Sequence, residues 1–593
     1  MPNKLSQFWQ ELKRRNVVRV ITVYAGAAFV ILELVSMSEE PFGLPDWTFV
    51  LAAVLLSIGF FIAIILSWIY DIHPEGGMVK TKPAHKVKDE DSHKSSSNWK
   101  IASYISFIVI IGLIALNIFV IREREEVDDS LEKSIAVLPF DNMSSDEEYA
   151  HLGLAIADEI IMELQKIKAF DRVISRSSTM QYKDRRPTVP EMAEKLGVNY
   201  IIEGSIQRQE EQVSVRIQVI RAKNEDHIWG EEYNRAWKDI NIIQDDIAKK
   251  VAEELRIVLT PGEIEIIEKL PTNNLEAYQQ YLLGKSHHWG VTQEEIEKGI
   301  QHFDRAIELD PDFALAYLYL AMSYQYMARY AWIHPKEVYQ KAMESIRKAI
   351  DLDNSLGEAH AIHGLLMAVL EWDFRGPEAE FQKAILLSPN SSVVYTAYAD
   401  YLRFNGRYEE NIKIAKKIIE LNPRSNALGS AYFWAGKFDE SIEEYKRIMG
   451  ADSSSYVSNI YLAYAYAMKG AKSEAIRYAL YVESLVGDVK ENPSNAADIG
   501  WVYGKAGQRD KAEKMLEMIL KAYENGKADP GYLSQIYAGL GDSDLTMEYI
   551  QKAYDIRSGF LIYLYCMSNT LFVDMSSDPR FTKILEKIGF EVN

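Results

Sequence analysis

Glycines recur at a nearly constant spacing in the second half of the chain, and this spacing is the feature that most constrains the fold. The steps between successive glycines are 30, 34, 37 and 34 residues. Small residues occupy similar places before each glycine, and a new helical pattern begins after it. A period of this length indicates helix–turn–helix units that cannot bury their apolar faces alone and must stack on one another. The glycines of the series are Gly406, Gly436, Gly470, Gly507 and Gly541.

A second signal marks the ends of the units. The segments "AIELDP", "AIDLDN", "AILLSP" and "IIELNP" close successive helical patterns, and three of them do so on proline, which cannot continue a helix. With the glycine spacing, this pattern resembles the tetratricopeptide repeat (TPR), which has about 34 residues and two helices per unit. We therefore expect an all-α TPR solenoid of about eight units over residues 272–593, including closing helices at the carboxy terminus.

Stacked TPR units form a superhelix with a concave groove, and such grooves hold peptides or protein segments. The first helix of each unit often faces the groove, so its residues are the candidate contacts with a partner. They are mainly apolar and aromatic, and packing within the solenoid explains each of them equally well. The candidate groove residues are Leu318, Met322, Ala361, Leu365, Thr396, Asp400, Ile460 and Tyr464.

Residues 131–259 are predicted to form a small α/β domain. Apolar residues between Leu152 and Ile167 recur at steps of three and four, which indicates a helix with one buried face. Alternation of apolar and polar residues is clearest at Val213, Val215, Ile217 and Val219 and indicates a strand. The expected elements are, in order, a strand at 135–140, this helix, a strand at Val173, a helix over 189–196, three strands, and a helix over 240–258.

The segments "SIAVLPFDNMS", "LGLAIADEIIMEL", "LGVNYIIEGSIQR" and "HIWGEEYNR" of this domain resemble the FlgO-like domain, which is similar to the TolB amino-terminal domain. The resemblance implies a fold and a place in the bacterial cell envelope, and it implies no reaction. Some relatives carry a cyclase or DNA-binding output domain before the membrane, for which this chain has too few residues. The residues that carry the resemblance are Pro139, Phe140, Gly153, Glu203, Gly204, Trp229 and Tyr233.

The first 125 residues are predicted to form a membrane region. Residues 17–36, 47–70 and 101–121 are each long and apolar enough to be read as a transmembrane helix, and residues 71–100 as a disordered loop. Lysines and arginines precede the first span and fill the loop after the second, so the amino terminus should be cytoplasmic. We therefore expect a multi-pass protein of the bacterial inner membrane, in contact with the lipid bilayer, with residues 122–593 in the periplasm.

The composition argues against several kinds of chemistry. The formal net charge of −20 would repel a phosphate backbone, so we expect no nucleic-acid partner. Asp158, Glu159 and Glu163 cluster on one predicted helix, but their spacing favours a solvated face over a pair of catalytic acids. The three neighbouring histidines, His287, His288 and His302, lack the spacing of a zinc motif. The prediction is a non-enzymatic protein with no catalytic residue, cofactor or metal.

Two functions fit these features. The favoured prediction is a membrane-anchored scaffold that binds a protein partner through its TPR groove in the cell envelope. The alternative is a signalling sensor, in which the α/β domain binds a ligand or envelope component and relays the change across the membrane. The identity of the partner, the pathway and the oligomeric state stay open at this point.

Overall fold

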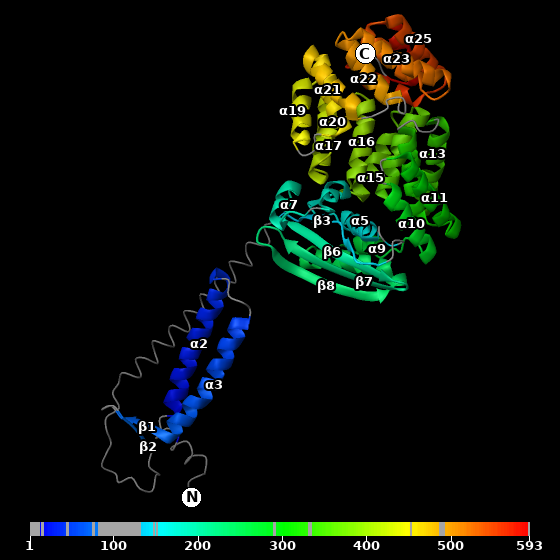
Figure 1. Cartoon of the computed structure of the whole chain (residues 1–593). Helices are drawn as coiled ribbons and strands as arrows, with labels where there is room; N and C mark the ends of the chain where they lie inside the picture. The colour runs from blue at the N-terminus through cyan, green and yellow to red at the C-terminus, as the bar shows by residue number, and fades with distance from the viewer. Residues whose placement is uncertain are drawn as a thin grey trace. The chain divides into compact units, whose positions relative to one another are not determined.

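The computed structural model describes residues 12, 17–42, 47–73, 77–80, 132–145, 149, 152–184, 186–288, 292–329, 335–450, 454–485 and 493–590. The chain divides into two compact units, Met1–Leu131 and Glu132–Asn593. Figure 1 shows the elements of each unit. The second unit holds both the α/β domain and the solenoid, so contacts between these two parts can be described.

The first unit contains two helices and a hairpin. Helix α2 (Val17–Phe42) packs against α3 (Trp47–Ile69), and the Tyr24 hydroxyl of α2 donates a 2.9 Å hydrogen bond to the Leu56 carbonyl of α3. Strands β1 (Tyr70–His73) and β2 (Gly77–Lys80) pair antiparallel, although residues 71–100 were predicted to be a disordered loop.

The predicted localisation is wrong. Among the described residues, no helix combines the length and the apolar character that crossing a membrane requires. The first span was predicted to end at residue 36, but α2 continues to Phe42. Its sequence includes four charged residues, Arg19, Glu33, Glu39 and Glu40. The third predicted span, 101–121, lies outside the described residues. Three other predictions depend on this localisation and are withdrawn as well. They are the periplasmic location of residues 122–593, the lipid bilayer as a partner, and the relay of a signal across the membrane.

The α/β domain is built on one mixed sheet, whose strand order is β5-β3-β6-β7-β8, with β4 also paired to β6. The strands around β3 run parallel, whereas β6, β7 and β8 form an antiparallel meander. The strands are β3 (Ser134–Val137), β4 (Asp141–Asn142), β5 (Arg172–Val173), β6 (Tyr200–Gln209), β7 (Gln212–Arg221) and β8 (Asp226–Ala236). The helices are α5 (Leu152–Gln165), α6 (Arg176–Thr179), α7 (Val189–Leu196), α8 (Ile240–Glu254) and α9 (Pro261–Ile267).

Helices α5 and α8 cover one face of this sheet. The alternation in β7 puts Val213, Val215, Ile217 and Val219 on that face, where all four are buried against the two helices. The other face carries a smaller core beneath α7, which includes Met192. Helix α7 has the predicted bounds, because Thr188 and Glu191 form a capping box at its start and Gly197, with φ of 68°, ends it. In Figure 1, α5 lies between the sheet and the solenoid.

The solenoid is mostly helical and TPR-like, with eight consecutive helix pairs among the described residues. Each proline of the repeat endings stands two residues after the last residue of a helix, as after Leu387 and Leu421. The pairs are α10 (Leu275–His288) with α11 (Gln293–Leu309), α12 (Ala314–Arg329) with α13 (Pro335–Leu352), α14 (Gly357–Leu366) with α15 (Pro377–Leu387), α16 (Ser392–Phe404) with α17 (Tyr408–Leu421), α18 (Ala427–Trp434) with α19 (Phe438–Met449), α20 (Tyr456–Met468) with α21 (Lys472–Leu485), α22 (Pro493–Lys505) with α23 (Arg509–Glu524), and α24 (Pro530–Leu540) with α25 (Ser543–Asp555).

The five glycines of the repeat all adopt the left-handed conformation. Their φ angles lie between 67° and 82°, at the turns between the two helices of a pair. An L-amino acid with a side chain is strained in this region, because Cβ approaches the following carbonyl oxygen. The spacing of the glycines therefore reports the spacing of the turns.

The carboxy-terminal segment folds back onto earlier repeats. It consists of a 3₁₀ turn (Gly559–Tyr563), α26 (Leu564–Met567), a second 3₁₀ turn (Val573–Met575) and α27 (Pro579–Ile588). The Phe590 ring stacks on Phe374 with centroids 4.3 Å apart, and the Tyr563 ring meets the edge of Phe404 at 5.1 Å. Asp578 caps α27 by accepting a 2.8 Å hydrogen bond from the Arg580 amide.

The turn glycines give a first testable prediction. At Gly470 an added Cβ meets no atom within 4 Å, so the left-handed φ of 75° is the whole cost of a side chain. We expect Gly470→Ala to lower the free energy of unfolding by about 1–2 kcal/mol. Gly262 is the matched control, because an added Cβ is equally unobstructed there and its φ is not left-handed. Equal urea-unfolding midpoints for Gly470→Ala and Gly262→Ala would contradict the explanation.

Candidate functional site

A buried lysine joins the α/β domain to the solenoid. Lys285 of α10 lies with its Nζ 2.8 Å from Asp158 Oδ2 and 2.5 Å from Glu159 Oε1, both on α5. The lysine side chain is 1% exposed. The prediction that Asp158 and Glu159 belong to a solvated helix face is therefore wrong, because the first solenoid repeat covers them. Glu163, one turn further along, pairs with Lys166 at 2.6 Å.

Aromatic side chains of the solenoid surround this ion pair. The Tyr281 hydroxyl donates a 3.0 Å hydrogen bond to Glu159 Oε1, and the Tyr319 ring packs edge-on against Tyr281 at 5.6 Å. Burial alone would lower the pKa of Lys285, but the two carboxylates outweigh it and raise the pKa above its usual value. The ammonium is therefore charged at neutral pH.

A second set of contacts joins the α/β domain to a later repeat of the solenoid. The Ser175 amide donates to the Leu421 carbonyl at 2.8 Å, and the Ser178 hydroxyl donates to Asn422 Oδ1 at 2.6 Å. Nearby, Asn390 Nδ2 donates to the Phe170 carbonyl at 3.2 Å. The α/β domain thus bridges the first repeat, at α10, and the fourth, at the end of α17.

Between these two contacts lies a pocket of about 440 Å³. Five of the eight predicted groove residues line it, from three successive repeats: Leu318, Met322, Leu365, Thr396 and Asp400. The others do not. Ala361 is fully buried in the packing around α14, and Ile460 and Tyr464 lie in the core of the later repeats, where the Tyr464 hydroxyl donates to Asp498 Oδ1 at 2.6 Å.

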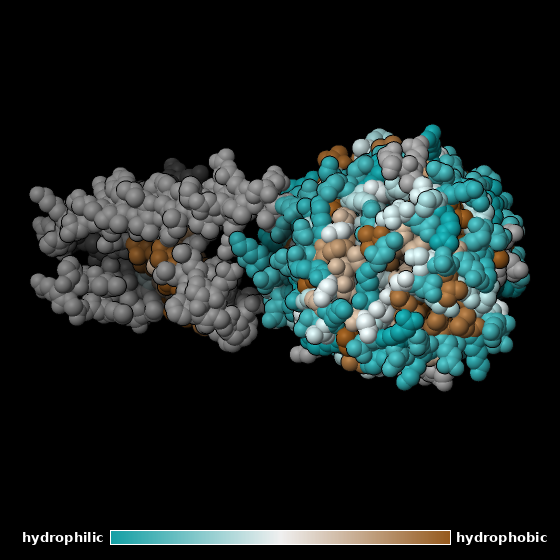
Figure 2. All heavy atoms as spheres, turned by 90° about the horizontal axis from the view of Figure 1, so that it is seen from above, coloured by the Kyte–Doolittle hydropathy of each residue, from teal (hydrophilic) through white to brown (hydrophobic). Residues whose placement is uncertain are grey.

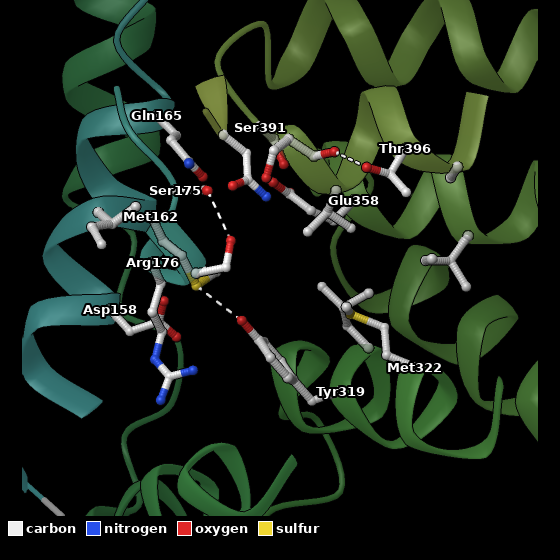
Figure 3. Close-up of a pocket in the computed structure, with 18 of the residues that line it drawn as sticks. Asp158, Met162, Gln165, Ser175, Arg176, Tyr319, Met322, Glu358, Ser391 and Thr396 are labelled. Carbon is white, nitrogen blue, oxygen red and sulfur yellow. Dashed lines mark hydrogen bonds between the residues drawn. The ribbon is translucent and has the colours of Figure 1, made fainter. Parts of the chain in front are cut away.

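Apolar and polar side chains line this pocket together. Met162 from α5 and Tyr319 and Met322 from α12 point into it and are apolar along most of their length (Figure 3). Polar side chains also face it, among them Gln165 from α5, Ser175 from the segment after α5, and Glu358 from α14. Figure 3 shows the open space between α5, with the segment after it, and the solenoid helices. The arrangement suits a molecule that carries both apolar and polar groups.

The histidines of the first repeat take part in packing. His287 stacks on His302 with ring centroids 5.6 Å apart and pairs with Glu295 at 2.7 Å. His288 is buried and shares a 2.7 Å hydrogen bond with the Ser323 hydroxyl. Burial and the charge of Lys285 lower the pKa of His288 to about 3, so its ring is neutral. In the described part of the chain, no cluster of three or more His, Cys, Asp or Glu side chains is placed to hold a metal ion.

Comparison with known proteins finds partial matches. Residues 131–250 match the family described as "HilA/YgeH-like transcriptional regulator, second domain". A protein of Rhizobium meliloti (strain 1021) named "Putative adenylate cyclase 3" is 31% identical over 249 residues, which is 42% of this chain and 42% of that protein. The chain thus spans about two fifths of this relative. The resemblance to the FlgO-like domain stays a prediction, as does the absence of a nucleic-acid partner.

Solved structures resemble the chain only in part. The human IFIT1 dimer with PPP-AAAA has a TM-score of 0.36 at 15% identity and covers 54% of this chain and 89% of its own. Yeast Tom70 has a TM-score of 0.35 at 15% identity, and the match covers 59% of this chain and 83% of Tom70. PilF of Pseudomonas aeruginosa has a TM-score of 0.28 at 17% identity, and the match covers 41% of this chain and 98% of PilF. Similarity at this level says nothing about a shared ligand.

The buried ion pair gives a second prediction. Lys285→Met leaves Asp158 and Glu159 buried without their cation, so we expect the free energy of unfolding to fall by about 3–5 kcal/mol. Lys298→Met is the matched control, because Lys298 pairs with Glu294 at 2.8 Å on the exposed face of α11 and its loss should leave the unfolding midpoint unchanged. The measurement is urea unfolding of the full chain at neutral pH. Similar midpoints for the two variants would show that the pair does not hold the domains together.

Proposed function

We propose that the chain is a non-enzymatic protein-binding scaffold that holds a short segment of a protein partner in the pocket between α5 and helices α12, α14 and α16. One observation carries the proposal. Side chains chosen from the repeat pattern alone, on three successive first helices, converge on one pocket together with side chains of the α/β domain. Its volume of about 440 Å³ lies within the range of pockets that bury a ligand the size of a few side chains.

The charges around the pocket bear on the partner. Asp158, Glu358 and Asp400 line it, against one guanidinium, Arg176. Asp158 is paired with Lys285, and Asp400 with Arg403 at 2.8 Å. Glu358 accepts a hydrogen bond from the Ser388 hydroxyl at 3.2 Å. An acidic segment would be repelled here, so the expected partner segment offers an aliphatic side chain to Met322 and Leu365 and polar or basic groups to the carboxylates.

On the face of the second unit seen in Figure 2, the outer surface favours an enclosed binding site rather than a flat one. On that face of the second unit, hydrophobic side chains occur as small separate areas among hydrophilic ones. Stable docking of a partner on an open surface uses a larger continuous apolar area. The pocket instead offers apolar contact that is already screened from water on several sides, which increases the gain from each buried side chain.

The third prediction tests this pocket. Thr396 is an exposed residue of α16 on the pocket wall, and Thr396→Trp should fill part of the space without disturbing the core. Peptides selected from a random library on the immobilised full chain should bind Thr396→Trp at least tenfold more weakly, measured by fluorescence anisotropy. Asp400 is a poorer choice for a variant, because its loss would leave Arg403 buried without its partner.

The matched control is Gln382→Trp. Gln382 is an exposed helical residue of α15 that does not line the pocket, so the same large side chain is added there without blocking it. Its peptide affinity should equal that of the unchanged chain. Selected peptides that bind Thr396→Trp as tightly as Gln382→Trp would place the binding site elsewhere and refute the proposal.

A further inference from the structure

A second, smaller pocket lies beside the first between the α/β domain and the solenoid. Its volume is about 160 Å³, and Met162 and Glu358 line both pockets. The lining comes from α5 and α8 on one side and from the starts of α12 and α14 and the ends of α13 and α15 on the other. The pocket is below the usual size range of sites for drug-sized ligands, so it suits only a small molecule.

Helix periodicity explains why polar groups gather at this place. Glu159 and Glu163 are four residues apart on α5 and share one face, and Lys166 follows directly after the last residue of this helix and pairs with Glu163. On α8, Gln244 and Asp245 follow Asn241 by three and four residues and are therefore its neighbours on the helix surface. Because both helices cover the same face of the sheet, these two polar rows meet above it, at the end turned toward the solenoid.

In each of two side-chain amides of the pocket, one polar atom lacks a hydrogen-bond partner among the described residues. Asn241 and Gln244 are 8% and 3% exposed, and in the described part of the chain Asn241 Oδ1 and Gln244 Nε2 have no hydrogen-bond partner. Gln244 Oε1 accepts a 2.9 Å hydrogen bond from the Tyr278 hydroxyl. Rotating the Gln244 amide by 180° would let Nε2 donate to Tyr278 and would leave the oxygen as the open acceptor. Buried polar groups are rarely left unsatisfied, so these two point to a missing ligand that donates hydrogen bonds.

The charge of the pocket is strongly negative. Two lysines face six carboxylates, those of Glu159, Glu163, Asp245, Asp312, Asp353 and Glu358. The lysines are already engaged, Lys166 with Glu163 and Lys269 with Asp353 at 2.8 Å. Among the described residues, Asp245 has neither an ion pair nor a hydrogen bond through its side chain. Burial, and after it the charge of Glu163, raises the pKa of Asp245 to about 7.

We propose that this pocket binds a small aliphatic diamine. One ammonium group lies against Asp245 and the Asn241 oxygen of the α/β domain, and the other against Glu358 of the solenoid. The alkyl chain lies along Met162, Leu315 and Leu356, which line the same space. A bare metal ion fits less well, because no cluster of three or more His, Cys, Asp or Glu side chains among the described residues is placed to hold one. A ligand so placed touches both parts of the second unit and would strengthen their contact.

The test uses the full chain and 1,4-diaminobutane as the probe. At constant ionic strength, millimolar 1,4-diaminobutane should raise the thermal unfolding midpoint by several degrees, and titration calorimetry should show saturable binding. Asp245→Asn should weaken binding at least tenfold, as should Asn241→Leu, which removes the amide acceptor. Glu254→Gln is the matched control, because it neutralises an exposed carboxylate on the same helix that does not line the pocket, and its affinity should be unchanged.

Three further probes separate this ligand from other sources of the same effect. 1,4-Butanediol has the length without the charge, and glutarate has the opposite charge, so neither should shift the midpoint. N-acetyl-lysine amide carries the ammonium of a protein side chain with its backbone, and should bind more weakly than the diamine in so small a space. Equal effects of the diol, tighter binding of the lysine derivative, or no loss in Asp245→Asn would each overturn the proposal.

The pH dependence of the affinity for 1,4-diaminobutane gives a further test of the proposal. Asp245 must be ionised to hold an ammonium group, so the affinity should fall as the pH is lowered from 8 to 6, through the pKa of about 7. The charged groups that face Asp245 are Glu163, Lys166, Lys249 and Glu268. In Asp245→Asn the residual affinity should be the same at both pH values. A pH-independent affinity in the unchanged chain would contradict the assignment to Asp245.

Discussion

The arrangement of the second unit depends on one buried charge. Lys285 joins the first solenoid repeat to α5 through Asp158 and Glu159, with little access to water on either side. Taking three charges out of water is costly, and the cost is offset only while the geometry holds all three together. The pair therefore favours one docked position strongly over others, because any shift that separates the lysine from its carboxylates leaves a charge buried alone. A rigid domain contact in this place is what allows two pockets to persist beside it.

The repeat could be read from the sequence because it has a local cause. Each turn needs a residue that tolerates a left-handed φ, and glycine supplies it at Gly406, Gly436 and the later turns. The bounds of α7 were predictable for a similar reason, since the cap residues that end it are adjacent in sequence. In such cases the deciding interactions lie within a few residues of one another, so a single sequence contains them.

The docking of the α/β domain could not be predicted, because its cause is not local. On α5, Glu159 and Glu163 have the spacing of a solvated face, and only the approach of Lys285, more than 120 residues later, makes Glu159 part of an interface. The same limit explains why only some of the predicted groove residues line the pocket. Leu318 and Leu365 line the pocket, whereas Tyr464, which occupies an equivalent repeat position, is turned into a buried cluster with Asp498 and Gln535. Repeat position alone does not tell which of them faces open space.

Two other parts of the chain pack onto the solenoid. The α/β domain contacts it at α10 and at the end of α17, and the larger pocket lies between these contacts. The carboxy-terminal segment occupies the later part, where the Trp501 indole donates a 3.0 Å hydrogen bond to the Leu571 carbonyl. Its Tyr565 ring also lies where a side chain at Gly406 would project, so that turn tolerates only glycine for two independent reasons. Under the proposed function, a segment held in the pocket beside Thr396 is short, because the α/β domain bounds this pocket on one side and three solenoid repeats bound it on the other.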